Sequence, residues 1–178
     1  MKKLLLAALS LGLLLSTSPA ARAQQTSPST LDLVHSADYE LSYRIPAAWR
    51  QVRQATDTTV TLSYLSPDET MTLFIVKLRG AADRLTPAQA LYQLTESFGV
   101  PVNKQYATRY NRLDFLETTG SGQRQGQTLR YDALAARHRG HVLLVYALAT
   151  PDAFINHEAL LNQVLHSFAD YRPKPARR

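Results

Sequence analysis

The segment Met71–Leu78, with the sequence MTLFIVKL, decides the fold. Its apolar side chains alternate between the two faces of an extended chain, with Met71, Leu73 and Ile75 on one face and Phe74, Val76 and Leu78 on the other. A strand that is apolar on both faces belongs in the interior of a sheet that is covered on both sides. We therefore expect a central strand here, with further structure packed against each face of the sheet.

The segments on either side of this strand have clear periodicities. Apolar and polar residues alternate over 39–45 and over 60–64, and this period of two predicts two half-buried strands. Downstream, Thr86-Pro87-Ala88-Gln89 has the residues of a helix start: Thr as the N-cap, Pro in the first turn and Gln at the third helical position. Leu91, Leu94 and Phe98 recur at helical spacing, and Gly99 is a natural stop.

The second half of the chain has a similar plan. We expect strands over 106–116, 127–136 and 141–149, and an exposed hairpin loop over the glycine-containing segment 118–127. Thr150-Pro151 repeats the helix start, and the apolar stripe that follows predicts a helix ending near Asp170. The predicted order is βββα-βββα. This order indicates an α+β fold with a mainly antiparallel six-stranded sheet covered by two main helices.

A short motif in the first half supports a particular fold. The segment 43–49, Tyr-Arg-Ile-Pro-Ala-Ala-Trp, is an alternating strand that runs into Ile-Pro-x-x-Trp. It resembles the opening of PsbP-like domains, a fold that also occurs in the bacterial periplasmic family DcrB. The resemblance covers about 33–171 and implies an αβα sandwich whose relatives act mostly in binding or assembly. It transfers no catalytic residues, and the chain departs from the DcrB-like lipoproteins because it has no cysteine.

The first 23 residues predict export. Lys2 and Lys3 precede an apolar run of about 12 residues, which is shorter than the roughly 20 that span a membrane. Ala21-Arg22-Ala23 fits a signal-peptidase site. We expect a signal peptide over 1–23, a linker over 24–32, one domain over 33–171 and a basic disordered tail over 172–178. The predicted location is the periplasm or the exterior, without a stable membrane anchor.

The positive charge of the chain lies mostly outside the predicted domain. Residues 1–23 hold three of the 20 basic residues and none of the 14 acidic ones, which leaves a net charge of +3. The tail holds four more basic residues, so residues 24–171 have a net charge of −1. A nucleic-acid-binding domain usually has a basic face, so this class of partner is excluded. The tail suits a weak contact with an anionic surface.

Aromatic residues near the motif suggest a binding cleft. Trp49 is followed by Arg50, and Tyr43 lies on the strand before it. Aromatic and arginine side chains together suit a sugar, a peptide or another small ligand. The alternative is that these aromatic side chains pack in the core, which is where sheets place most of them.

Three other groups of residues have the composition of a functional site. His138 and His141 have a spacing that two metal ligands can share, but a metal site usually needs a third protein ligand. His157 and Glu158 could form an acid–base pair, and structural roles are the alternative for both histidine groups. The segment 119–126 is rich in glycine, but it joins two predicted strands, whereas a phosphate loop precedes a helix.

No catalytic residue or cofactor is assigned by these patterns. The sequence favours a non-enzymatic exported module that binds a protein or a small ligand near Trp49, Arg50 and Tyr43. The alternative is a small exported hydrolase or metal-binding protein that uses His138 and His141, or His157.

Overall fold

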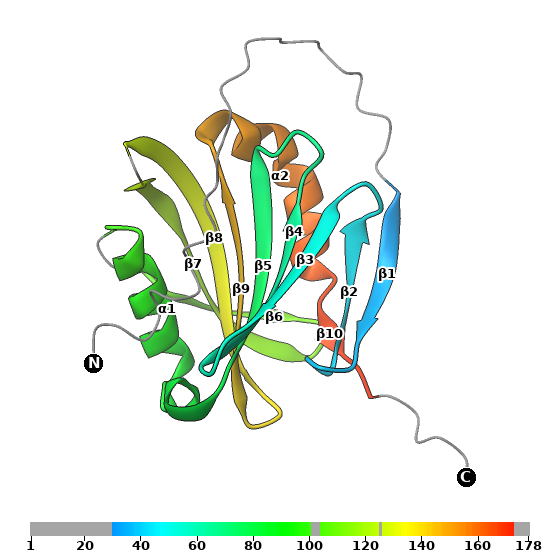
Figure 1. Cartoon of the computed structure of the whole chain (residues 1–178), viewed down its shortest axis with the longest axis vertical. Helices are drawn as coiled ribbons and strands as arrows, with labels where there is room; N and C mark the ends of the chain where they lie inside the picture. The colour runs from blue at the N-terminus through cyan, green and yellow to red at the C-terminus, as the bar shows by residue number, and fades with distance from the viewer. Residues whose placement is uncertain (1–29, 101–103, 125, 173–178) are drawn as a thin grey trace.

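The computed structural model describes residues 30–100, 104–124 and 126–172. Two sheets form its framework (Figure 1), and every strand pairing in them is antiparallel. The large sheet has the order β3-β4-β5-β9-β8-β7-β6, formed by β3 (Arg50–Ala55), β4 (Thr59–Leu65), β5 (Met71–Leu78), β6 (Tyr106–Tyr110), β7 (Leu113–Arg124), β8 (Gln127–His138) and β9 (His141–Ala149). The small sheet has the order β1-β2-β10, formed by β1 (Leu31–Ser36), β2 (Leu41–Pro46) and β10 (Ala169–Asp170).

The strand β5 lies inside the large sheet, between β4 and β9, as its sequence predicts. The side chains of Met71, Leu73 and Ile75 belong to one buried cluster, and those of Phe74, Val76 and Leu78 belong to the other. The two clusters lie on opposite faces of the sheet. Alternation along one strand therefore divides the interior of the protein into two cores.

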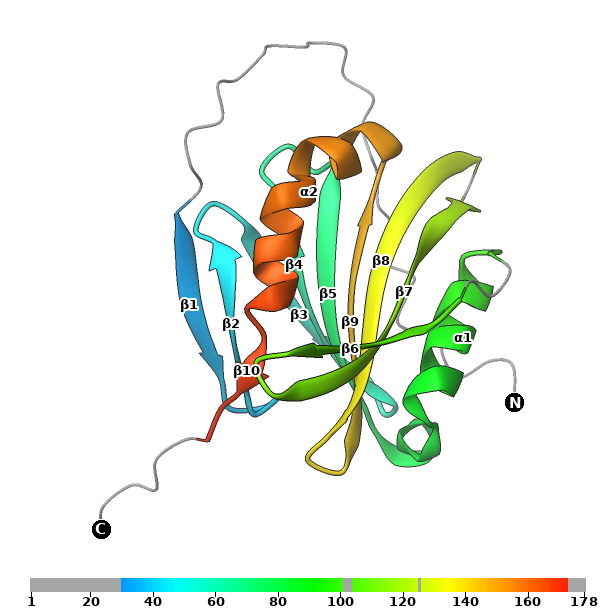
Figure 2. The ribbon, with the colours of Figure 1, turned by 180° about the vertical axis from the view of Figure 1, so that it is seen from behind.

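Each core is closed by a helix. The helix α1 (Pro87–Ser97) packs over β7, β8 and β9 on one face, preceded by the 3-10 turn η2 (Gly80–Arg84). The helix α2 (Pro151–His166) packs on the other face, against β8 and β9 and against β2 of the small sheet. Figure 2 shows α2 in front of the large sheet, with β2 on one side of it and β7 and β8 on the other. The arrangement confirms the predicted α+β class.

Both helices begin as the sequence predicts. In α1 the hydroxyl of Thr86 accepts a hydrogen bond from the Gln89 backbone at 3.2 Å, and the Gln89 side chain accepts one from the Thr86 backbone at 2.8 Å. In α2 the hydroxyl of Thr150 accepts a hydrogen bond from Ala153. These bonds satisfy backbone N–H groups that have no partner within the helix. The second helix ends at His166, and Ala169 and Asp170 pair with β2 as β10 instead.

The prediction of six strands in one sheet is wrong. The predicted strand over 106–116 is a hairpin, in which Asn111 and Arg112 turn the chain with φ of 45° and 70°. The predicted loop over 118–127 is mostly strand: Gly120 and Gly122 belong to β7, and Gly126 lies in the turn before β8. Gly122 in β7 leaves room for its neighbours, because a Cβ there would lie 2.3 Å from a Val100 methyl group and 2.9 Å from the Phe98 carbonyl oxygen.

The ends of the predicted domain differ slightly from the structure. The strand β1 begins at Leu31, so it includes the last two residues of the predicted linker. The predicted signal peptide, residues 24–29 of the linker and residues 173–178 of the tail lie outside the described residues. No helix within the described residues is long and apolar enough to cross a membrane.

Candidate functional site

The structure places the predicted aromatic site inside the core. Trp49 is 8% exposed and Tyr43 is fully buried. The Tyr43 hydroxyl shares a 2.8 Å hydrogen bond with the Tyr64 hydroxyl, and its ring stacks on Phe168 at 5.0 Å. Burial raises the pKa of Tyr43 well above its ordinary value. Packing in the core, the alternative interpretation of these aromatic residues, is thus observed.

Arg50, the third residue of that prediction, lies on the surface. Its guanidinium is 3.3 Å from the carboxylate of Glu69, and both side chains are largely exposed. Because Tyr43 has no accessible surface, the structure does not bring Arg50, Trp49 and Tyr43 together around one accessible cleft.

The two predicted metal ligands have separate partners. His138 and His141 face each other across the β8–β9 hairpin. The Nε2 atom of His138 lies 3.1 Å from the backbone oxygen of Glu40, whereas Nδ1 of His141 lies 2.7 Å from Asp83. Each histidine therefore ties the hairpin to a different neighbouring segment. Within residues 30–100, 104–124 and 126–172, no three His, Asp or Glu side chains are grouped so that they could hold a metal ion.

The predicted acid–base pair on α2 is also divided. Nε2 of His157 lies 3.7 Å from the carboxylate of Asp68, in the turn between β4 and β5. Glu158 is exposed on the same helix. The structure thus pairs His157 with a residue of another segment and not with its neighbour in the sequence.

An open pocket of about 590 Å³ lies at the end of the molecule where His138 is found. We call it the arginine pocket. Its lining comes from three segments that are distant in the sequence: the β6–β7 turn, the β8–β9 turn and the residues around β10. The course of these segments can be followed in Figure 2. Its lining consists of Asn111, Arg112, Leu113, His138, Arg139, Ala169, Asp170 and Arg172.

Backbone geometry sets the shape of the arginine pocket. The side-chain amide of Asn111 donates hydrogen bonds to the backbone oxygens of His166 and Phe168, at 2.6 and 3.1 Å. These bonds fix the β6–β7 turn against the end of α2, and the left-handed conformation of the turn places Arg112 on the rim. Arg139 also has a positive φ, of 51°, and precedes Gly140 in the β8–β9 turn. Two turns of unusual conformation therefore each present an arginine.

Asp170 is the anionic centre of the arginine pocket. The Nη2 atom of Arg139 lies 2.7 Å from each carboxylate oxygen of Asp170, and Nε of Arg172 lies 3.8 Å away. The hydrogen bonds from Arg139 hold the pKa of Asp170 below its usual value. No ion pair joins Arg112 to an acidic side chain in the part of the chain that the structure describes.

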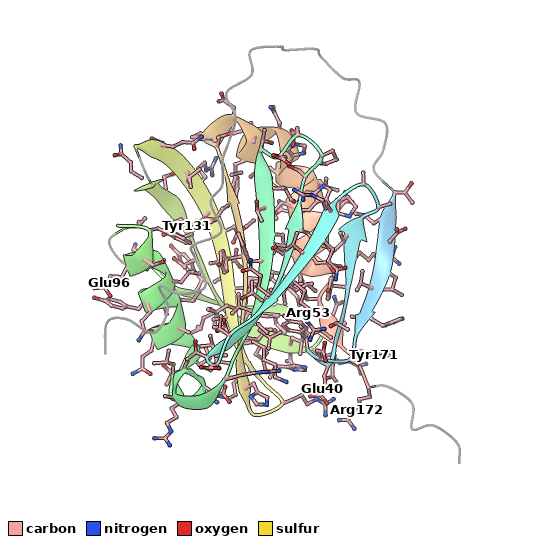
Figure 3. The ribbon with its side chains drawn as sticks, viewed as in Figure 1. Glu40, Arg53, Glu96, Tyr131, Tyr171 and Arg172 are labelled. Atoms are coloured by element: carbon pink, nitrogen blue, oxygen red, sulfur yellow. The ribbon has the colours of Figure 1, made fainter. Side chains whose placement is uncertain are left out.

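A backbone hydrogen bond joins two segments next to the arginine pocket. Glu40, Tyr171 and Arg172 lie near one another there (Figure 3), and the Tyr171 N–H donates to the Glu40 backbone oxygen at 2.9 Å. The Tyr171 ring also stacks on His35 at 4.5 Å. Three arginines surround this pocket, with Asp170 in its lining and the Glu40 carboxylate close to Arg139. The positive charge is in excess, and a pocket of this kind can accept an anionic group.

A second polar site, which the sequence analysis did not propose, lies on the α2 face of the large sheet. Asp132 on β8 is 7% exposed, and its Oδ1 atom has no hydrogen-bond partner. Burial raises the pKa of this carboxyl group to about 7, and the charge of Glu117 contributes to the rise. The signal in the sequence is one acidic residue directly before the apolar run Ala133–Ala136 of β8, on the same face as Leu134 and Ala136.

The neighbours of Asp132 extend this site across three strands. Glu117 on β7 accepts a 3.0 Å hydrogen bond from the hydroxyl of Tyr110 on β6. We call Asp132, Glu117 and Tyr110 the carboxyl row. The Tyr110 ring contacts the ring of His166 in the last turn of α2, with 4.4 Å between their centroids. At the other end, Arg130 lies over the ring of Phe154 in the first turn of α2, at 4.6 Å.

Comparison with known proteins identifies the fold. Cyanobacterial PsbP (CyanoP) from Synechocystis aligns with 86% of this chain and 100% of its own, with a TM-score of 0.61 and 10% identity. LpqN of Mycobacterium tuberculosis, described as involved in cell envelope biogenesis, aligns with 80% of this chain and 91% of its own, with a TM-score of 0.50 and 17% identity. A Bacteroides thetaiotaomicron protein aligns with 82% of this chain and half of its own, with a TM-score of 0.52 and 14% identity.

The fold is therefore PsbP-like, as the Ile-Pro-x-x-Trp motif suggests. No protein-family model matches the sequence, and no curated protein matches it. At these identities the likeness concerns the fold alone. The function must be argued from the arginine pocket and the carboxyl row themselves.

Proposed function

We propose that this chain is an exported, non-enzymatic binding module, and that the arginine pocket takes an oxyanion such as a phosphate group. The observation that carries the proposal is the composition of the pocket: three arginines line it, and Asp170 is the one acidic residue in its lining. Guanidinium groups donate several hydrogen bonds in one plane, a geometry that matches phosphate and carboxylate oxygens. Arg112 on the rim has no acidic partner among the described residues, so it is available to an incoming anion.

The sequence on either side of the domain is consistent with this proposal. Lys174, Arg177 and Arg178 follow Arg172, which lies on the rim of the arginine pocket. Each basic residue near an anionic surface contributes about 1 kcal/mol to binding. The predicted signal peptide would deliver the protein to the envelope or the exterior, where phosphate groups are abundant on lipid surfaces.

Binding is favoured over catalysis because the titratable groups of the arginine pocket already have partners. His138 faces a backbone oxygen, and Asp170 is held by Arg139 with its pKa lowered. Neither group is placed as a general base that could act on a bound ligand. The alternative hydrolase or metal-binding function has no comparable support, because His138, His141 and His157 each contact a different segment.

Vesicle binding tests the proposal. The protein without residues 1–23 is sedimented with vesicles of phosphatidylcholine alone and with vesicles that contain phosphatidylglycerol. We expect binding to the anionic vesicles that decreases with salt. Arg112→Asn, which keeps a residue that tolerates a positive φ, should weaken it about fivefold, the equivalent of one surface charge. Arg53→Gln, a change of the same charge on β3, is the control and should have a smaller effect.

Titration with inorganic phosphate separates the two sources of the anion. Saturable shifts of the backbone amides near Arg112 and Arg139 would assign a pocket for a free phosphate group. Shifts with vesicles alone would assign a contact with lipid headgroups through the same arginines. Equal binding to both kinds of vesicle, with no response to phosphate, would contradict the proposal.

A further inference from the structure

The carboxyl row contains a buried acid whose position packing does not explain. Asp132 lies between Thr119 of β7 and Ala147 of β9 in the ladder of the large sheet. Leu134 and Ala136 follow it on the same face, and both belong to the buried cluster beneath α2. An apolar residue would complete that cluster. Instead the chain places a carboxyl group there and leaves Oδ1 without a hydrogen-bond donor.

The positive charge of Arg130 lowers the pKa of this carboxyl group but does not outweigh the effect of burial. Arg130 lies two residues earlier on the same face of β8, but its guanidinium is over the ring of Phe154, and no ion pair within the described chain joins it to Asp132. Glu117, on the neighbouring strand, is a second carboxylate and raises the cost of ionising Asp132. Buried polar groups are normally satisfied, so an unpaired oxygen beside a second acid indicates a missing donor.

We infer that the carboxyl row is a binding site for an organic ammonium group, such as the end of a lysine side chain or an amine-bearing small molecule. An ammonium group has three donors and one positive charge. One donor would satisfy Oδ1 of Asp132, and another would reach the carboxylate of Glu117. Tyr110 already orients Glu117 through its 3.0 Å hydrogen bond and offers an aromatic ring beside the bound cation.

An ammonium group fits the carboxyl row better than a metal ion does. Calcium takes six to eight oxygen ligands, and the described residues contain no group of three acidic or histidine side chains that could hold an ion. The approach to the site is over β7, because Thr119, the residue opposite Asp132, is exposed, and Glu117 is half-buried. A slender alkylamine would have to approach from this side, because Oδ1 of Asp132 is itself buried.

The other charged groups around the carboxyl row define its response to pH. They are Glu117 on β7, Tyr110 on β6, Arg130 on β8 and, at the end of α2, His166. On the same helix, His157 is turned toward Asp68, and Glu158 is exposed. When an ammonium group binds to protonated Asp132, the carboxyl group releases one proton to the solvent, and the ammonium group takes its place. Affinity should therefore rise with pH by up to tenfold per unit and become constant above the Asp132 titration.

Titration with n-butylammonium chloride tests the inference. The protein without residues 1–23 is titrated at several values between pH 5 and 8, and the side-chain carboxyl carbon of Asp132 and the amides of β7 and β8 are followed by NMR. We expect saturable shifts whose midpoint falls as pH rises, with proton release in calorimetry below pH 7. Butanol and sodium chloride at equal concentrations are the controls for the alkyl chain and for ionic strength.

Two variants make the test specific. Asp132→Asn should abolish saturable binding while the protein remains folded, and Glu117→Gln should weaken binding without abolishing it. Glu96→Gln, which removes an acid from α1 on the other face of the sheet, should change nothing (Figure 3). The inference would be overturned by the absence of saturation at every pH, by an equal response to butanol, or by unchanged binding in Asp132→Asn. None of these outcomes depends on anion binding by the arginine pocket.

Discussion

Asp132 and Asp170 show how two environments give one residue type opposite properties. Asp170 lies at the edge of the small sheet. Its side chain is 40% exposed and forms an ion pair with Arg139. Hydrogen bonds from this guanidinium lower its pKa. Asp132, in the large sheet, is 7% exposed, and burial raises its pKa to about 7. One carboxylate is stabilised as an anion, and the other titrates near physiological pH.

The difference arises from what the surrounding segments bring to each carboxyl group. The β8–β9 turn and the residues that follow β10 meet at Asp170, so arginine side chains can reach it while their charged groups stay near water. Strands and a helix pack around Asp132, and the guanidinium of Arg130 lies over an aromatic ring instead. Irregular segments thus form a site suited to anions, while the regular core keeps an acid that lacks a donor.

Replacing Asp132 tests the comparison most directly. The Asp132 carboxyl group holds its proton more tightly in the folded state than in the unfolded chain, where its pKa is near 4. The free energy of unfolding should therefore fall as pH rises from about 4 to about 7, and Asp132→Asn should remove this part of the dependence. At pH 8 we expect the variant to be more stable than the parent by roughly 1–3 kcal/mol.

Urea denaturation of both proteins at pH 5 and pH 8 measures this effect. The gain in stability should be present at pH 8 and much smaller at pH 5, where the parent carboxyl group is already protonated. Equal pH dependence in parent and variant would show that the native state does not hold Asp132 in its protonated form.

Replacing Asp170 should produce the opposite pattern. A lowered pKa stabilises the fold above the ordinary titration of the acid, and this stabilisation is lost as pH falls through the pKa of the folded state. Asp170→Asn should therefore lower stability at neutral pH and have little effect in acid. The change is smaller than that for Asp132, because solvent screens an exposed ion pair.

Asp170→Asn should also increase the affinity of the arginine pocket for anions. Removing the one carboxylate that lines the arginine pocket leaves Arg139 and Arg172 free for an incoming anion. At about 1 kcal/mol per charge near an anionic surface, affinity for phosphatidylglycerol vesicles should rise about fivefold. A loss of binding in Asp170→Asn would indicate instead that its main role is to hold the arginines in position.

Regular periodicity made most of the framework predictable. The doubly apolar segment Met71–Leu78 and the two Thr-Pro helix starts correspond to β5, α1 and α2. The strand β3 was missed because five of its six residues are exposed, so its sequence RQVRQA has no alternation. The β6–β7 turn was missed because Asn111-Arg112 lacks the glycine that usually accompanies a left-handed turn.

The sites were less predictable because their partners are distant in the sequence. His138 was identified by its spacing from His141, yet it contacts Glu40, 98 residues away. The arginine pocket requires two turns and the segment around β10 to meet, and local sequence patterns do not specify that these segments lie together. Asp132 lies within a predicted strand but was not singled out, because its burial depends on α2 and on the pairing of β7 with β8.

Replacing Glu117 separates the two causes of the raised Asp132 pKa and has the smallest expected effect. Burial is the larger cause and the charge of Glu117 is the smaller one, so Glu117→Gln should lower the Asp132 titration midpoint by less than about one pH unit. The amide can still accept the hydrogen bond from Tyr110, which keeps that ring in place. The carbon chemical shift of the Asp132 carboxyl group, followed from pH 4 to 9, measures the midpoint, and Glu96→Gln serves as the matched control. An unchanged midpoint would assign the shift to burial alone, whereas a fall toward pH 4 would make the second carboxylate the dominant cause.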